Sequence, residues 1–136
     1  MNASKGVRWA VIGLSALVAG CLVAAAGAGA GGGIYFTSRG AEGVVPASVE
    51  RAAHATDQAF DHFKIRKTKV AAERSDEGQK QEISGTAAER KEEVTVTLRA
   101  EDPGSTRIQV VARKSAVTWD KSFARVVLEQ IVTSAR

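Results

Sequence analysis

The sequence predicts an α+β fold: an antiparallel sheet of four to five strands with two helices on one face, in the order β-α-β-β-β-β-α. Apolar residues recur with helical spacing in two stretches and with a period of two in the stretch between them. Charge is also distributed unevenly, because no residue between Arg8 and Arg39 is charged and all 15 acidic residues lie at Glu42 or later. The 136 residues therefore divide into an apolar N-terminal segment and one small folded domain.

The N-terminal segment has the organisation of an export signal. Two basic residues precede an apolar core that begins at Trp9, and small residues follow this core. A helix over the whole apolar run, residues 9–36, would be about 42 Å long, which exceeds the ~30 Å hydrocarbon core of a bilayer. The glycines of residues 27–33 also disfavour a helix. We therefore predict a signal peptide at residues 1–20.

The end of that signal peptide resembles the lipobox of bacterial lipoproteins. The branched residue, the two small residues and the cysteine of the motif are Val18, Ala19, Gly20 and Cys21. The resemblance implies that a signal peptidase recognises the first three and that the thiol of Cys21 takes a diacylglyceryl group as a thioether. The alternative role of Cys21 is that of a small buried residue in an uncleaved anchor helix. Cys21 is the only cysteine, so the chain contains no internal disulfide.

Residues 21–40 are predicted to form the lipidated cysteine and a Gly- and Ala-rich tether. Acyl chains hold a protein on a membrane with ~0.8 kcal/mol per buried methylene. Leu22 rather than Asp follows the cysteine. In enterobacterial-type sorting this favours the outer membrane, with the domain facing the periplasm, over the inner membrane. The alternative is an uncleaved single-pass inner-membrane protein that oligomerises through the glycine spacings of residues 27–33.

The domain is predicted to span residues 41–136 and to contain two helices. A short strand that ends at Pro46 comes first, because proline cannot donate to a sheet. Ser48 is a suitable N-cap for the first helix, whose apolar face extends to Phe63. Asp120 is the corresponding cap of the second helix. The apolar residues at helical spacing in that helix are Phe123, Val126, Val127 and Ile131.

Four strands are predicted between the two helices. Alternation of apolar and polar residues indicates strands at residues 64–73, 80–88 and 93–100, separated by polar or Gly-containing turns. A strong turn at residues 102–105 leads into the fourth strand, which carries Ile108, Val110 and Ala112 on the apolar face. The alternation predicts a sheet with one buried face and one solvated face.

Several of these features occur together in one known family. The matching stretches are Ala24 to Phe36, Gly40 to Ala53, Ile83-Ser84-Gly85, Val94 to Leu98, and Asp120 with Arg125, Leu128 and Ile131. In this combination the chain resembles the small bacterial lipoproteins catalogued as domain of unknown function 3568. The resemblance implies a lipobox, an Ala-rich helix, a four-strand meander and a short last helix, and it implies no catalytic residues. Those proteins tend to carry Gly before the Asp, where this chain has Trp119.

The sequence contains no recognisable catalytic arrangement. His54 and His62 lie opposite the apolar stripe of the first helix and are predicted to face solvent rather than to bind a metal. No histidine follows His62, so the serines near Asp120 have no local base for a hydrolase triad. The Gly-rich run lacks the lysine of a phosphate-binding loop. We therefore predict that the protein is not an enzyme and uses neither a metal nor another cofactor.

The candidate partner contacts are Trp119, Lys67 and Lys69. Trp119 precedes a helix cap, where an apolar residue either packs on the first turn or serves as an anchor for a partner. Lys67 and Lys69 are predicted to share one face of a basic strand, as a solvated surface or as a contact with envelope phospholipids. An exported domain without interleaved aromatic residues is a poor nucleic-acid binder. The sequence thus predicts a membrane-anchored interaction module for an unidentified envelope protein or glycan, of open oligomeric state.

Overall fold

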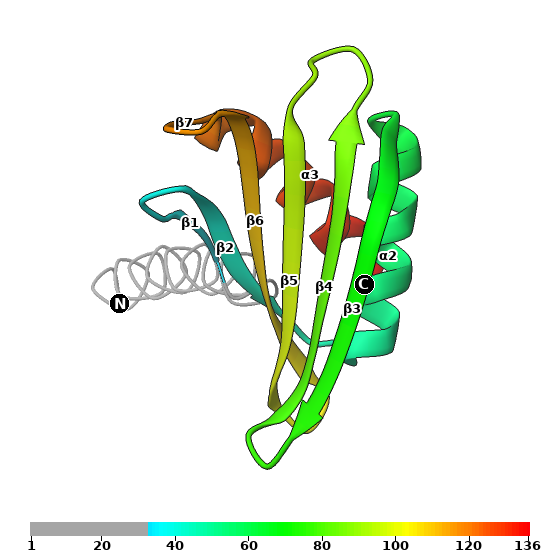
Figure 1. The fold of residues 1–136 in the computed structure, drawn as a ribbon. Coiled ribbons are helices and arrows are strands. Elements are labelled where there is room, and N and C mark those ends of the chain that lie inside the picture. The colour runs from blue at the N-terminus through cyan, green and yellow to red at the C-terminus, as the bar shows by residue number, and fades with distance from the viewer. Residues whose placement is uncertain (1–32) are drawn as a thin grey trace, which may run out of the picture. The chain divides into compact units, whose positions relative to one another are not determined.

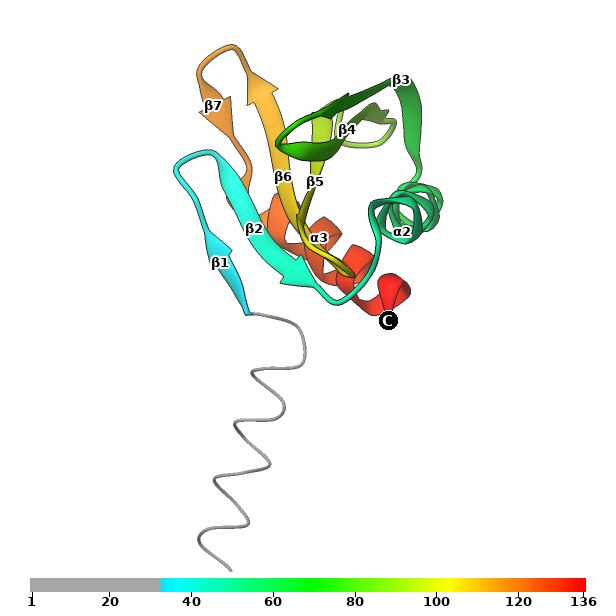
Figure 2. The ribbon, with the colours of Figure 1, turned by 90° about the horizontal axis from the view of Figure 1, so that it is seen from below.

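The computed structural model describes residues 33–136, which form a sheet with both helices on one of its faces (Figures 1 and 2). The sheet has seven antiparallel strands: six follow the order β1-β2-β6-β5-β4-β3, and the seventh, β7, pairs with β6. The helices are α2 (Val49–His62) and α3 (Lys121–Ala135). The strands are β1 (Ile34–Phe36), β2 (Gly40–Val45), β3 (Ile65–Ser75), β4 (Gly78–Ala87), β5 (Glu93–Asp102), β6 (Ser105–Ser115) and β7 (Thr118–Trp119).

The predicted α+β class, the antiparallel sheet and the two helices on one face are confirmed. The predicted number of four to five strands is wrong, because β1 and β7 add two short edge strands. Neither is long enough to show a period of two. β1 also lies within residues 21–40, for which the sequence predicted a tether, and it pairs with β2 through Tyr35 opposite Glu42. Residues 21–32 lie outside the described residues.

Helix α2 begins where the capping residue predicts. The Ser48 hydroxyl accepts the N–H of Arg51 at 3.2 Å. Glu50 lies in the first turn, where the helix dipole favours an acidic side chain. The buried face of α2 packs on α3 and on strands β3 to β6. The helix ends at His62 with Phe63 as its C-cap, and Lys64 then takes a left-handed φ of 55° that turns the chain into β3.

Helix α3 buries three of the four apolar residues predicted for its stripe, and four others with them. Phe123, Val127 and Ile131 are buried as predicted, but Val126 is 46 % exposed. At about 100° per residue, Val126 lies on the far side of Phe123 from the stripe, whereas Leu128 lies within it and is fully buried. Leu128 faces β2, near Gly43.

Strands β5 and β6 form the centre of the sheet. Their alternating residues Val94, Val96 and Leu98 on β5 and Ile108 and Val110 on β6 are fully buried against the helices. The residues between them, such as Thr95 and Thr97, are only partly buried on the opposite face. The predicted division into one buried and one solvated face is therefore confirmed.

Strand β3 departs from simple alternation. Its pairing with β4 shifts between Lys67 and Lys69, which lie opposite the adjacent residues Gly85 and Ser84. Adjacent residues of a strand point to opposite faces, so the bulge at Thr68 places the two lysines on opposite faces of the sheet. The prediction that Lys67 and Lys69 share one face is wrong for this reason.

Candidate functional site

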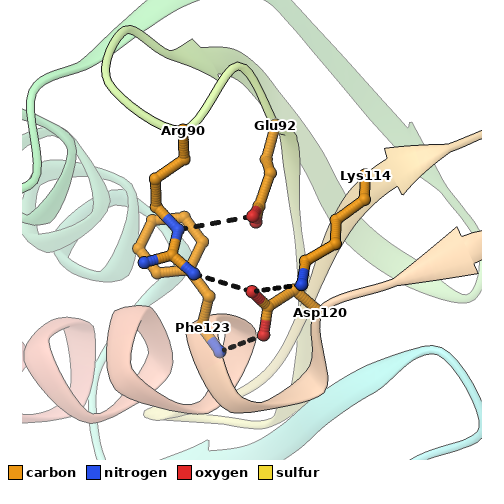
Figure 3. A network of polar contacts seen from close by, with 5 residues as sticks. All are labelled: Arg90, Glu92, Lys114, Asp120 and Phe123. Carbon is orange, nitrogen blue, oxygen red and sulfur yellow. Dashed lines mark hydrogen bonds and ion pairs between the residues drawn. The ribbon is translucent and has the colours of Figure 1, made fainter.

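Polar side chains from three parts of the fold meet at the start of α3 (Figure 3). Asp120 caps the helix by accepting the N–H of Phe123 at 2.9 Å, and its other oxygen pairs with Arg90 Nη2 at 2.8 Å and with Lys114 Nζ at 3.5 Å. Arg90 also donates through Nε to Glu92 Oε1 at 3.3 Å. Its guanidinium lies over the Phe123 ring, 4.4 Å from the centroid. The network thus joins the β4–β5 turn and β6 to α3.

The charges of this network stabilise one another. Burial alone would raise the pKa of Asp120, but the N–H of Phe123 and the cations of Arg90 and Lys114 lower this pKa below its ordinary value. The hydrogen bond to Asp120 in turn raises the pKa of Arg90. Asp120 is therefore ionised at neutral pH and acts as a fixed acceptor rather than as a proton donor.

Glu92 has a different role from Asp120. Its backbone carbonyl accepts the N–H of Ala87 at 2.9 Å, which closes the β4–β5 turn. Its side chain is 5 % exposed, and within residues 33–136 its Oε2 atom has no hydrogen-bond partner. A buried oxygen without a partner is unfavourable. The carboxylate of Glu92 is thus held mainly by its contact with Arg90.

A cavity of about 450 Å³ lies beside the network. This volume is within the range of roughly 300–1,000 Å³ that small-molecule sites occupy. Its apolar lining consists of Ala87, the exposed Val126, and the rings of Phe63 and Phe123, whose centroids are 5.9 Å apart in an edge-to-face arrangement. The polar lining consists of His62, Lys64, Glu89, Arg90, Asp120 and Ser122.

The cavity has the features of a small-molecule binding site. His62, Ser122 and Asp120 all line it, but no hydrogen bond in the described domain joins any two of them. Asp120 is already engaged by Arg90 and by the helix, so it cannot orient a histidine base. The aromatic lining and the fixed guanidinium of Arg90 can instead hold a small ligand with an apolar part and a hydrogen-bond acceptor.

The histidines lie at the solvent-exposed surface of α2, as predicted. His54 and His62 are both exposed, and the His62 ring packs edge-on against Phe63 at 4.8 Å. Within residues 33–136 no three His, Cys, Asp or Glu side chains are grouped so that they could hold a metal ion.

The three candidate partner contacts do not form one site. Trp119 lies on β7, half-buried, with the guanidinium of Arg39 5.2 Å from its ring centroid. Lys67 pairs with Asp57 of α2 at 3.0 Å, on the helix side of the sheet. Lys69 lies on the other face of β3, at the opposite edge of the sheet from β1. The predicted lipidation site Cys21 and the recognition residues Val18, Ala19 and Gly20 lie outside the described residues.

Sequence reasoning missed the part of the site contributed by the β4–β5 turn. The sequence indicates only a polar turn between the strands predicted at residues 80–88 and 93–100, because Arg90 lies 30 residues before Asp120 and the pair leaves no local pattern. The N-cap at Asp120 was the one feature of the sequence that could have indicated this polar network. An acidic N-cap attracts a nearby cation, but the sequence contains many basic residues that could supply it.

These features define a small α+β domain with a two-helix layer on an antiparallel sheet and a cavity at one end of that layer. A family model described as protein of unknown function (DUF3568) matches residues 7–134, so the chain belongs to this family. A comparison with curated proteins finds no match. Neither helix of the described domain is long and apolar enough to cross a membrane.

Proposed function

We propose that the protein is a lipoprotein anchored to the bacterial cell envelope, and that its domain is a non-enzymatic binding module for an envelope protein or glycan. The observation that supports the lipid anchor is the lipobox-like motif at residues 18–21, which follows a basic N-terminal region and an apolar core. Leu22 after the cysteine favours the periplasmic face of the outer membrane. In this proposal the acyl chains on Cys21 hold the protein on the membrane, and no membrane-spanning helix is needed.

Charge is consistent with an envelope partner rather than nucleic acid. Residues 1–20 contain Lys5 and Arg8 and no acid, so their removal lowers the formal net charge from +4 to +2. The basic character of the whole chain is thus partly a property of the signal peptide. The domain offers two binding features: the cavity beside α3 and the solvated face of the sheet.

An uncleaved single-pass inner-membrane protein is the second candidate. The observation that favours it is the spacing of Gly27 with Gly31 and of Gly29 with Gly33, which permits close packing of membrane helices. In that protein Cys21 would remain unmodified within the anchor. The state of Cys21 therefore distinguishes the two proposals.

Metabolic labelling with a palmitate analogue tests the lipid anchor. We expect the wild-type chain to incorporate label and Cys21→Ala to incorporate none, because the thiol is the site at which the diacylglyceryl group attaches. Ser15→Ala is the matched control, since this residue lies in the apolar core outside the lipobox, and it should label like the wild type. Equal label in Cys21→Ala and the wild type would refute the proposal.

A further inference from the structure

The β1 side of the domain combines exposed aromatic residues with arginines. Tyr35 is 49 % exposed and its hydroxyl accepts from Arg107 at 2.9 Å, while donating to Glu42 at 2.6 Å. Phe36 is 51 % exposed, with the guanidinium of Arg125 5.3 Å from its ring centroid. Both residues lie on a short edge strand whose outer edge has no partner strand in the described sheet.

A third aromatic residue with an arginine lies next to this strand. The turn after β1 carries Arg39, which contacts Trp119 of β7. Both views show β1 and the β6–β7 turn on the same side of the molecule (Figures 1 and 2). Val117, in the β6–β7 turn, is 78 % exposed. Tyr35 and Phe36 are adjacent in the strand and point to opposite faces, so the group wraps around the β1 edge: Tyr35, Arg39 and Trp119 lie on the open side of the sheet, and Phe36 with Arg125 lies on the helix side. We call this group the β1-side surface.

This surface is close in sequence to the predicted anchor. Twelve residues, 22–33, separate Cys21 from Ile34 at the start of β1. Thirteen steps of fully extended chain span at most about 45 Å, so an anchor on Cys21 keeps β1 within that distance of the lipid. Every other element of the domain is joined to the anchor only through β1.

We propose that the β1-side surface rests on the anionic phospholipid surface of the membrane that holds the anchor. The inference rests on the proposed lipid anchor. Tyrosine and tryptophan side chains such as Tyr35 and Trp119 favour the headgroup region, where their apolar body and polar edge are both accommodated, and the exposed ring of Phe36 adds apolar area. Arginines beside them attract anionic lipid phosphates. Within residues 33–136, Arg39 forms no ion pair, and Arg125 pairs only with the exposed Glu129.

The opposite edge of the sheet does not combine these features. Strand β3 carries Lys67 and Lys69 but no aromatic residue, and the ammonium of Lys67 is paired with Asp57. Its bulge and its lysines are also the usual means by which an exposed edge avoids association. The two edges thus differ in chemistry, and substitutions on β3 provide controls for those on the β1 side.

Quenching of Trp119 fluorescence by brominated phospholipid tests the inference. With Trp9→Phe, the full chain contains Trp119 as its only tryptophan, whether or not the signal peptide is removed. The protein is purified from membranes and reconstituted into phosphatidylcholine vesicles with or without phosphatidylglycerol, in brominated or plain form. We expect strong quenching and a blue shift of emission in the vesicles with brominated phosphatidylglycerol, and weaker quenching without the anionic lipid.

Paired substitutions separate surface contact from anchoring. Arg39→Gln with Arg125→Gln should lower the ratio of docked to undocked protein about fivefold for each arginine removed. Lys67→Gln with Lys69→Gln removes the same charge and should leave quenching unchanged. If the protein floats with the vesicles but Trp119 is not quenched, or if the two pairs behave alike, the surface contact is refuted while the anchor stands. If the protein carries no lipid by mass and does not float, both proposals fail.

Discussion

Replacing Gly40 by alanine is expected to destabilise the domain by about 3 kcal/mol, the upper part of the usual range for overpacking. Gly40 is buried at the start of β2, opposite Val111 of β6. A Cβ atom at this position would overlap the backbone carbonyl oxygen of Val110 and approach the Val111 Cα to 3.1 Å. Backbone atoms cannot rotate away as a flexible side chain can. The alanine therefore forces β2, and β1 with it, away from β6.

Urea unfolding of the full chain, followed by far-UV circular dichroism, measures this effect. Gly43→Ala on the same strand is the matched control, because its nearest contact would be the Gly33 carbonyl oxygen at 3.2 Å and the next the Ile34 side chain. We expect Gly43→Ala to change the free energy of unfolding by less than about 1 kcal/mol. Equal effects of the two substitutions would contradict the close approach of β2 and β6.

Asp120→Ala is expected to reduce the free energy of unfolding by about 2–3 kcal/mol at neutral pH. Loss of an N-cap typically costs ~1 kcal/mol, and the partners of a buried carboxylate lose a further interaction. The cost is limited by Arg90, which is about half exposed and can be solvated once Asp120 is removed. Glu92→Gln is the matched control, since glutamine keeps an acceptor for Arg90 and removes a carboxylate that has an unpaired oxygen.

The pH dependence of the Asp120 effect has a defined direction. Because the pKa of Asp120 is lowered on folding, its stabilising contribution is present above the unfolded value near 3.8 and is lost as the pH falls through the folded pKa. The difference between the wild type and Asp120→Ala should therefore be constant from pH 7 to about pH 5 and should shrink in stronger acid. Urea unfolding at several pH values measures this difference. A difference that grows in acid, or a Glu92→Gln effect as large as that of Asp120→Ala, would contradict the assigned roles.

Local signals in the sequence predicted the parts of the fold that depend on local physics. Ser48 and Asp120 cap the two helices because short polar side chains accept from helix N–H groups wherever a helix begins. The alternation in β5 and β6 predicted the buried face because side chains that pack against the helices are apolar, and every second residue of a strand points to that side. These relations require only neighbouring residues.

The parts that were not predicted depend on contacts between distant residues. The bulge at Thr68 separates Lys67 from Lys69 through the pairing of β3 with β4, which the sequence of β3 alone does not reveal. The short strand β1 forms because β2 offers it an edge, although residues 34–36 are too few to show alternation. Arg90 reaches Asp120 only when the β4–β5 turn is placed beside α3. The candidate cavity beside α3 arises from the same placement.

The most direct test of the proposed lipid anchor is the intact mass of the chain purified from membranes. The proposal predicts a protein that begins at Cys21 and carries the added mass of a diacylglyceryl group, with or without a further acyl chain. Fragmentation should place that mass on the first residue. A chain that retains residues 1–20 with an unmodified Cys21 would contradict the lipid anchor and favour the single-pass membrane protein.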